Sequence, residues 1–374
     1  MDFELTDEQK MLSETVTRFV AETYNFQARE HALKTSDGWS REAYAAIAEM
    51  GLLGLPFAEE DGGFGGGGVE MMVIMEAMGR GLMVEPYFAT AVLAGGALRH
   101  GGSAEQKAAI IPDLIAGERL LGLAHNEAGL PRHTLQARST ATASGDGWTI
   151  DGNKIAVIHG QSADTLIVSA NSARGLSLFL VDAKAPGVTI DAGRGYDGVP
   201  VAAIGLSGVK GELIGTEGEG EAILSTVFEE STAALTAEAV GAMAETLDLT
   251  VEYLKTRQQF GVAIGSFQAL QHRAVDMMMQ VELSRSMAVL AALSFDIDAD
   301  QRSRNISAAK AQIGKSGRMI GQEAVQMHGA IGITAEYKVG HAFKRLTAID
   351  ALLGDRDYHL ARLVDLRGVY PSAA

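Results

Sequence analysis

Apolar residues recur at a helical spacing over roughly the first third of the chain. Two capping boxes, the polar patterns that begin helices, each precede an amphipathic run: Thr6-x-x-Gln9 and Ser103-x-x-Gln106. Between them lies a helically spaced stripe of methionines: Met71, Met72, Met75 and Met78. Because methionine fills irregular gaps in hydrophobic cores, this stripe predicts core packing rather than a ligand site. Residues 1–118 are therefore predicted to form a helical domain.

From residue 119 to residue 222 the pattern changes to short apolar runs rich in Val, Ile, Thr and Leu. Gly, Asp and Pro separate these runs, as in WTIDGNKIAVI, where Asp151-Gly152 is expected to form a turn. Apolar runs of strand length that are separated by turn-forming residues predict a β domain with antiparallel strands.

Beyond the acidic, glycine-rich stretch at 216–221 the helical spacing returns. One helix is expected to carry the apolar residues between Val240 and Leu254, a second to cover 268–295 and a third to cover 306–329. Long helices joined by short glycine-bearing turns predict a bundle over residues 223–374. The fold class is therefore α+β with three domains in the order helical, β, helical.

Composition narrows the chemistry that this fold can carry. The 374 residues include no cysteine, which excludes disulfides, thiolate nucleophiles, cysteine-ligated zinc and iron–sulfur clusters. The formal net charge of -16 argues against a general attraction to nucleic acid or to anionic membranes. The start of the chain lacks the pattern of a signal peptide, and no apolar run reaches membrane-spanning length, so a cytoplasmic protein is expected.

Two weaker patterns favour ordinary structural roles. The glycine cluster at 63–68 satisfies GxGxxG, and Glu85 is near the expected acidic position. However, the residues before it predict a helix rather than the buried strand of a dinucleotide-binding unit, so a flexible loop is expected. Five histidines lack metal-ligand spacing and are expected to be hydrogen-bonded structural residues: His125, His159, His328, His341 and His359.

Two stretches of the last domain combine residue types that suit a nucleotide. RQQFG at 257–261 sets an arginine and a glutamine beside an aromatic at a helix end. Arginine can bind a diphosphate bidentately, and phenylalanine can pack on a nucleotide. In QMHGAIG at 326–332, glycines after a helical run can let the backbone approach a ligand. Each stretch taken singly also fits a plain helix end, and that alternative stays open.

Together and in this order, RQQFGVAIGSFQALQ and QMHGAIGITAEYKV closely resemble the signatures of the flavin-dependent acyl-CoA dehydrogenase family. The resemblance spans the chain, because GLLGLPFAEEDGGFGG resembles the family's amino-terminal loop. It implies a helical domain over 1–118, a middle antiparallel β domain over 119–222 and a four-helix bundle over 223–374. It also implies a tetramer or a dimer of dimers with FAD at a dimer interface.

In this family the pyrophosphate and adenosine of FAD are held by a neighbouring subunit through these two motifs. The residues that carry over are Arg257, Gln259, Phe260 and Phe267 from the first motif, and Gln326, Met327, Gly329 and Ala330 from the second. Ala330 replaces a usual glycine. The resemblance therefore implies that this chain holds the distal half of another subunit's FAD.

The chain's own site departs from the family pattern. Beside the flavin ring, many members have threonine-glutamate-proline, where this chain has AHNE at residues 124–127. Members also have tryptophan-isoleucine-threonine over the ring, where this chain has AVI at residues 156–158. The catalytic glutamate falls on Leu353, and an alternative base position falls on Ser231, next to Thr232 in place of a common arginine. A positioned base contributes roughly a hundred- to ten-thousand-fold to proton transfer, and leucine cannot accept a proton.

The resemblance thus implies that this chain has no catalytic residue. It implies a non-catalytic subunit of a heteromeric acyl-CoA dehydrogenase, most similar to the type called pimeloyl-CoA dehydrogenase small subunit. A homologous catalytic subunit would complete an α2β2 assembly, with a dicarboxylyl, fatty or steroid side-chain CoA thioester as substrate and an electron-transfer flavoprotein as electron acceptor. Two alternatives stay open. One is a structural or CoA-binding homologue without redox function. The other is a self-sufficient homo-oligomer with a displaced base, for which the candidates are Glu230, Asp350 and Asp355.

Overall fold

The structure is a computed structural model that describes residues 5–131, 133–145 and 147–367. The chain divides into two compact units. The helical unit comprises Met1–Arg29, Gly67–Met83 and Thr232–Ala374, and the β unit comprises Glu30–Gly66 and Val84–Ser231. Two helices contain a boundary between the units: α2 (Phe26–Lys34) and the long α7 (Gly220–Thr256).

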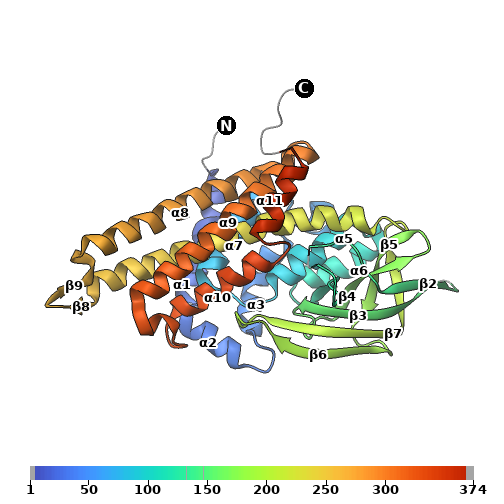
Figure 1. The fold of residues 1–374 in the computed structure, drawn as a ribbon. Coiled ribbons are helices and arrows are strands. Elements are labelled where there is room, and N and C mark those ends of the chain that lie inside the picture. Colours follow the sequence, from blue (N-terminus) through green and yellow to red (C-terminus); the bar gives the residue numbers. More distant parts are fainter. Residues whose placement is uncertain (1–4, 132, 146, 368–374) are drawn as a thin grey trace. The chain divides into compact units, whose positions relative to one another are not determined.

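The centre of the helical unit is α9 (Ala299–His328). It contacts the helices α8 (Gln268–Ala292), α10 (Lys338–Ala351) and α11 (Arg356–Asp365). Helix α4 (Gly68–Gly81) packs on α8 and also contacts α1 (Asp7–Glu22). Short elements complete the unit: β8 (Gln258–Gln259), β9 (Val262–Ala263), η4 (Ile264–Ser266), η5 (Leu293–Asp296) and η6 (Gly329–Ile333). β8 and β9 lie where α7 leads into α8 (Figure 1).

Local sequence signals account for several helix ends and faces in this unit. Thr6 and Gln9 form the expected capping box at the start of α1. In the methionine stripe of α4, Met75 and Met78 are buried, which confirms the prediction of core packing for these two. The observed α8 agrees with the predicted helix within a few residues, whereas α9 begins at Ala299, seven residues before the predicted start, and ends one residue before the predicted end.

Two glycines let α4 and α7 cross at close range. A Cβ atom on Gly79 would lie 1.9 Å from the carbonyl oxygen of Glu238, and one on Gly241 would lie 1.9 Å from that of Glu76. Real side chains cannot approach a backbone oxygen so closely, so the helices would have to separate to admit even a methyl group.

Gly241→Ala is therefore expected to lower the free energy of unfolding by about 1–3 kcal/mol, as overpacking of a core does. Urea titration of the purified variant measures the effect. The matched control is Gly96→Ala in α5 (Gly95–Gly101), where the added Cβ would meet Val227 at an ordinary 3.5 Å. Stability of the control should stay level or rise, because alanine favours helix over glycine. Equal urea midpoints for Gly241→Ala and the unchanged protein would contradict the close crossing.

A seven-stranded sheet dominates the β unit. Its strands are β1 (Leu121–Ala124), β2 (Thr140–Ser144), β3 (Gly147–Ile158), β4 (Thr165–Ser172), β5 (Gly175–Asp182), β6 (Val188–Arg194) and β7 (Pro200–Ile214). The order is β1-β4-β2-β3-β7-β5, with β6 on β7. Because β4 also pairs with β5, the strands from β4 to β5 close into a ring.

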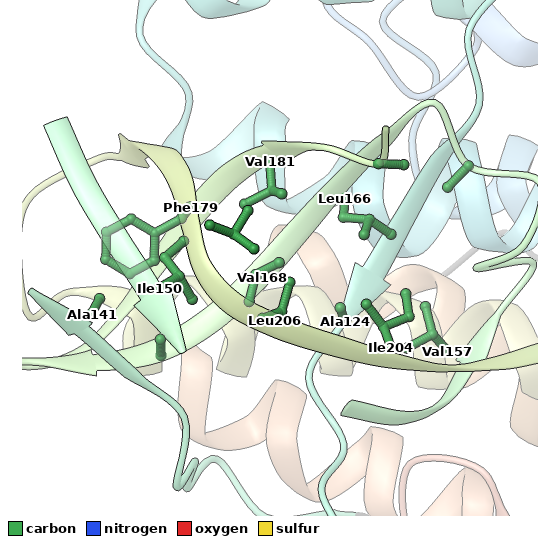
Figure 2. Close-up of a cluster of buried hydrophobic side chains, with 14 of the residues drawn as sticks. Ala124, Ala141, Ile150, Val157, Leu166, Val168, Phe179, Val181, Ile204 and Leu206 are labelled. Atoms are coloured by element: carbon green, nitrogen blue, oxygen red, sulfur yellow. The ribbon is translucent and has the colours of Figure 1, made fainter. Parts of the chain in front are cut away.

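Apolar side chains from these strands gather in one cluster between them (Figure 2). Ile150, Leu166, Val168 and Phe179 in this cluster have no exposed surface. Burying each such side chain contributes roughly 1.5–3 kcal/mol, so this cluster is the main stabilising core of the β unit.

Helical segments of the β unit precede and follow the sheet in the sequence. They are α3 (Arg41–Glu49), η1 (Leu52–Gly54), η2 (Glu59–Asp61), η3 (Phe88–Ala94), α5 and α6 (Ala104–Ile115), followed after the sheet by the start of α7. The capping box predicted at Ser103 and Gln106 begins α6.

Two sequence-based expectations for the sheet need correction. Most strand pairs are antiparallel as predicted, but β4 pairs in parallel with both β1 and β2. The turn expected at Asp151-Gly152 is wrong, because both residues lie inside β3 at an irregularity of its pairing with β7. Gly152 is needed there because a Cβ atom would lie 2.1 Å from Oγ of Ser139.

None of the helices within residues 5–131, 133–145 and 147–367 combines the length and the apolar character needed to cross a bilayer.

Candidate functional site

The first motif ends in an unusual hairpin. Strands β8 and β9 are joined by Phe260 and Gly261, which both have positive φ, 53° and 82°. This is the pattern of a type I′ turn, which glycine adopts readily and an aromatic residue does not. Nevertheless the side chain of Phe260 is 91% exposed. An aromatic residue that is both strained and exposed points to a contact outside its own fold.

The other residues of the first motif surround this tip. Arg257 and Gln259 are exposed, and the ring of Phe267 meets the ring of Phe260 edge to face at 6.3 Å. The backbone of Arg257 is fixed, because its N–H donates to the carbonyl of Tyr253 and its carbonyl accepts from Ile264. The hairpin thus holds a guanidinium and two aromatic rings together on a defined backbone.

The second motif lies at the end of α9. Gln326, Gly329 and Ala330 are exposed, whereas Met327 is buried and therefore packs beneath the surface. Gly329 has a positive φ of 64°, and no atom of the described residues lies within 4 Å of a Cβ built there. Positive φ and open space suit a backbone that a ligand approaches closely.

Stacked rings bring the two motifs together. Tyr253, one turn before Arg257, stacks on His328 of the second motif with ring centroids 4.4 Å apart. The ring of Tyr337 lies beside both of these rings, with its centroid 5.0 Å from that of His328 and 6.5 Å from that of Tyr253. The predicted binding residues, apart from Met327, lie on the surface, and the stack of Tyr253 on His328 connects the helix before the first motif with the second motif.

Leu353, where the family resemblance places a catalytic base, follows the end of α10. It is half-buried and has a positive φ of 56°. Beneath it, the fully buried Lys310 of α9 donates to the carbonyl oxygens of Asp350 (3.0 Å), Leu352 (2.9 Å) and Gly354 (2.5 Å). Burial lowers the pKa of Lys310 to about 8, although nearby acids oppose the shift. A buried cation thus ties down the chain at the end of α10.

The three acids considered as displaced bases have structural partners. Glu230 accepts from Arg99 and from Nε2 of His100. Burial alone would raise the pKa of Glu230, but these cationic partners lower it, which weakens it as a base. Asp350 accepts from the backbone N–H of residue 356 (3.2 Å), and Asp355 caps α11 by accepting from that of residue 358 (2.9 Å).

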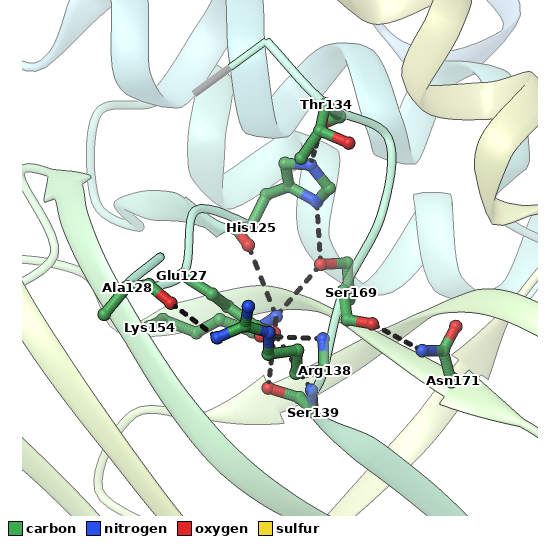
Figure 3. Close-up of polar contacts among 10 residues, drawn as sticks. His125, Glu127, Ala128, Thr134, Arg138, Ser139, Lys154, Ser169 and Asn171 are labelled. Carbon is green, nitrogen blue, oxygen red and sulfur yellow. Dashed lines mark hydrogen bonds and ion pairs between the residues drawn. The ribbon is translucent and has the colours of Figure 1, made fainter. Parts of the chain in front are cut away.

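A buried polar network lies in the β unit around His125 (Figure 3). Nε2 of His125 is 2.7 Å from the carbonyl oxygen of Thr134, and Nδ1 is 2.8 Å from Oγ of Ser169. Burial lowers the pKa of His125 to about 4, so the ring is neutral near pH 7. A carbonyl only accepts, so Nε2 donates to it and Nδ1 accepts from the serine hydroxyl. Both ring nitrogens are therefore already used within the fold.

The same network contains a buried ion pair. Nζ of Lys154 lies 2.6 Å from Oε1 of Glu127, and both side chains are almost fully buried. Glu127 also accepts from the hydroxyl of Ser139 and from the backbone N–H groups of Arg138 and Ser139. Burial alone would raise the pKa of Glu127, but these hydrogen bonds, led by that from Lys154, lower it to about 2.

Glu127→Gln is expected to destabilise the protein by about 3–5 kcal/mol, because it leaves the ammonium of Lys154 buried without its counter-charge. Urea unfolding at pH 7 measures this. The matched control is Glu217→Gln, since the partner of Glu217, Arg174, is largely exposed, and its effect should stay within about 1 kcal/mol.

The pH dependence gives a second readout. Because the pKa of Glu127 is lower in the folded state, its stabilising contribution is present above pH 4.5 and is lost as the pH falls towards 2. The stability of Glu127→Gln should therefore fall less steeply over this range. Parallel curves for the variant and the unchanged protein would contradict the ion pair.

Three family models match the chain in sequence order. They are the acyl-CoA dehydrogenase N-terminal domain over residues 6–118, the middle domain over 122–209 and the C-terminal domain over 218–365. The chain belongs to the acyl-CoA dehydrogenase family. Its relatives include "Probable acyl-CoA dehydrogenase YngJ" of Bacillus subtilis, 30% identical over 98% of this chain and 99% of that protein. Acyl-CoA dehydrogenase FadE27 of Mycobacterium tuberculosis is 27% identical over 97% and 98% of the two chains.

Solved structures agree with this assignment. A variant of the Tcur3481-Tcur3483 steroid ACAD matches with a TM-score of 0.88 and 29% identity, over 96% of this chain and 97% of that chain. The ChsE4-ChsE5 complex from Mycobacterium tuberculosis matches with a TM-score of 0.89 and 27% identity, over 98% of this chain and 98% of that chain. PigA with FAD and proline matches with a TM-score of 0.90 and 26% identity, over 98% of this chain and 100% of that chain. The predicted fold class is confirmed, and the family is one whose members bind FAD.

The exposed arginine and aromatic residues of the hairpin are of the types that suit a diphosphate and a nucleotide. At the positions that the family resemblance aligns with the flavin ring, Ala156 offers a methyl group instead of an indole, and Ile158 has no hydroxyl. Ala156 also has a positive φ of 51°, at a second irregularity of β3.

The β8–β9 hairpin, the ring stack on His328 and the burial of Lys310 were not predicted from the sequence. A lysine among small and apolar residues in ISAAKAQIG was a usable signal, because a buried lysine must find several acceptors. The expectation of structural histidines is confirmed for His125 and His328, whose rings bond to Thr134 and Ala324.

Proposed function

We propose that this chain is the non-catalytic subunit of a heteromeric FAD-dependent acyl-CoA dehydrogenase, of the type called pimeloyl-CoA dehydrogenase small subunit. Its part is to hold the distal half of an FAD whose ring lies in a homologous catalytic subunit. The observation that carries the proposal is Phe260, an aromatic residue 91% exposed on a strained turn beside Arg257. Such a tip has no use within its own fold and suits a cofactor from outside.

Each residue of the two motifs has a role in this proposal. Arg257 donates to the diphosphate, because its planar guanidinium matches two phosphate oxygens. Phe260 and Phe267 pack on the adenosine, and Gln259 and Gln326 offer amide donors and acceptors to the nucleotide. The backbone at Gly329 and Ala330 approaches it closely, while Met327 supports this surface from below.

The catalytic base belongs to the partner subunit in this proposal. Dehydrogenation of an acyl-CoA thioester requires a base that removes the α-proton, and a bound FAD would supply the acceptor for the hydride from the β-carbon. Leu353 cannot act as that base, and the acids nearest to it in sequence, Asp350 and Asp355, already accept backbone hydrogen bonds. The missing hydroxyl at Ile158 further supports a chain that does not use a flavin ring of its own.

The partners follow from the same proposal. The ChsE4-ChsE5 and Tcur3481-Tcur3483 structures combine two named chains each, which supports a hetero-oligomer, proposed here as α2β2. We propose an electron-transfer flavoprotein as the electron acceptor, because the family resemblance implies one. The substrate is proposed to be an acyl-CoA of a fatty, dicarboxylic or steroid side-chain acid, oxidised in the cytoplasm.

The test is to purify this chain alone and together with the homologous dehydrogenase encoded beside its gene. Both preparations are assayed for acyl-CoA dehydrogenation with an artificial electron acceptor. Turnover is expected only from the co-purified pair. Full turnover from the lone chain would defeat the proposal. In that case, single substitution of Glu230, Asp350 and Asp355 by their amides would identify the acid responsible.

A further inference from the structure

We propose that a groove between α1, α4 and α8 is a binding site for an uncharged, mostly apolar molecule with a hydrogen-bonding head. The groove has a volume of about 480 Å³, which is within the range of sites that hold small molecules. All three helices belong to the helical unit. The groove is separate from the hairpin, because Arg285 in its lining follows Phe267 by about 18 residues, or about 27 Å along a helix.

Two contacts between helices hold the walls of the groove in place. Nε2 of Gln9 on α1 donates to Oε1 of Glu70 on α4 (2.7 Å). Further along α4, Glu76 pairs with Arg285 of α8. These contacts connect each outer helix to α4, so the groove exists before a ligand arrives, and a preformed site lowers the cost of binding. An apolar space without a filling molecule also loses dispersion contacts at its walls, so a filled groove is the more stable state.

One end of the groove is closed and apolar. There α4 begins beside the end of α8, and a Cβ atom on Gly68 would lie 2.2 Å from the carbonyl oxygen of Ala292. The apolar residues of the lining near this end are Leu5, Val69, Met72, Val289 and Leu293. Met72 belongs to the methionine stripe but is half-buried, whereas Met75 and Met78 are buried in the core. An adaptable methionine here suits the apolar chain of a ligand.

Polar side chains line the other end, where Arg80 lies about 16 Å beyond Val69 along α4. They are Thr17, Glu76, Arg80 and Arg285. Both ion pairs of Arg80 are made by its Nη1 atom, and a guanidinium has five N–H donors. The remaining N–H groups of Arg80 and the hydroxyl of Thr17 can therefore bind an oxygen atom at the head of a ligand.

The charges at the polar end select an uncharged head. Each of the two arginines lies beside two carboxylates: Glu245 and Asp248 beside Arg80, and Glu76 and Glu282 beside Arg285. Even with Lys338, which also pairs with Glu245, the acids outnumber the bases in this group. An anionic head would meet this excess of carboxylates, and a cationic head would have to displace an arginine from its partners. A hydroxyl or carbonyl oxygen can accept from Arg80 without breaking an ion pair. The class of ligand is therefore a chain-like alcohol, ester or amide.

The first test compares three probes that share an eight-carbon chain: 1-octanol, octanoate and octylammonium. In calorimetric titrations of the purified full-length chain at pH 7, octanol is expected to bind roughly tenfold or more tightly than either ion. A charged head would lose hydration without gaining a free counter-charge. Equal or tighter binding of octanoate or octylammonium would overturn the uncharged head. Absence of binding by all three probes would overturn the site.

The second test places the probe in the groove. Thr17→Trp is expected to lower the affinity for octanol by roughly tenfold or more, because the indole would occupy the polar end. The matched control is Thr15→Trp, an exposed position on the same helix that is not part of the lining, and it should leave the affinity unchanged. Thermal unfolding checks that both variants are folded. Unchanged affinity in Thr17→Trp, or an equal loss in both variants, would overturn the groove as the site. Neither test involves FAD or the homologous subunit, so failure here leaves the proposed function standing.

Discussion

Replacing Arg257 with alanine is expected to lower the FAD affinity of the purified hetero-complex by roughly ten- to hundredfold while the two chains stay together. A charge-assisted hydrogen bond contributes about 1.5–3 kcal/mol, and each 1.4 kcal/mol is about a tenfold change in affinity. Assembly should persist because the hydrogen bonds that fix this part of the hairpin use the backbone of Arg257 and not its side chain. Flavin absorbance after equilibrium dialysis measures the affinity, and sedimentation measures assembly.

Lys255→Ala is the matched control for this prediction. Lys255 is exposed like Arg257 and precedes it by two residues near the same helix end, so both substitutions remove one positive charge from the same region. A loss of flavin that depends only on net charge would appear in both variants. Unchanged flavin content in Arg257→Ala would contradict its assignment to the diphosphate.

Lys310→Met is expected to lower the free energy of unfolding by about 2–4 kcal/mol. The substitution removes three hydrogen bonds and leaves the carbonyls of Asp350, Leu352 and Gly354 without their donor. Each unsatisfied buried carbonyl costs about 1–3 kcal/mol, and relief from burying a charge offsets part of the sum. Lys315→Met on the same helix is the matched control, because Lys315 is exposed and its loss should change stability by about 0.5 kcal/mol or less.

The pH dependence distinguishes the buried lysine from a packing effect. Burial lowers the pKa of Lys310 from 10.5 to about 8, so between these values the unfolded chain binds more protons at this site. Its contribution to stability therefore rises with pH over this window. The difference in stability between the unchanged protein and Lys310→Met should grow from pH 8 to pH 10. A constant difference would contradict the placement of a shifted lysine at the end of α10.

Features that depend on neighbouring residues were predictable from the sequence. The capping boxes at Thr6 and Ser103 begin helices because their side chains bond to backbone N–H groups three residues later. The helical spacing of apolar residues predicted α8 within a few residues and the end of α9 within one residue, because this spacing repeats many times along such helices. The first seven residues of α9 were not predicted. The two nucleotide motifs were found because their residues are close together in the sequence.

Features set by distant contacts were not predictable. Gly152 looked like a turn residue, but its conformation serves the close approach of Ser139, which belongs to another segment. The parallel pairing of β4 with β1 joins segments that are more than forty residues apart in the sequence, as Leu121 with Thr165. The role of Lys310 depends on the end of α10, which lies about forty residues later in the sequence and becomes its neighbour only in the fold.

The claim that this chain holds a cofactor it cannot use is tested most directly by counting FAD in the purified hetero-complex with native mass spectrometry. Half as many FAD molecules as protein chains are expected, with none on the lone chain. Substitution of Arg257 should then empty sites whose flavin ring lies in the partner. One FAD for every chain, or a fully flavin-loaded lone chain, would contradict the proposed function.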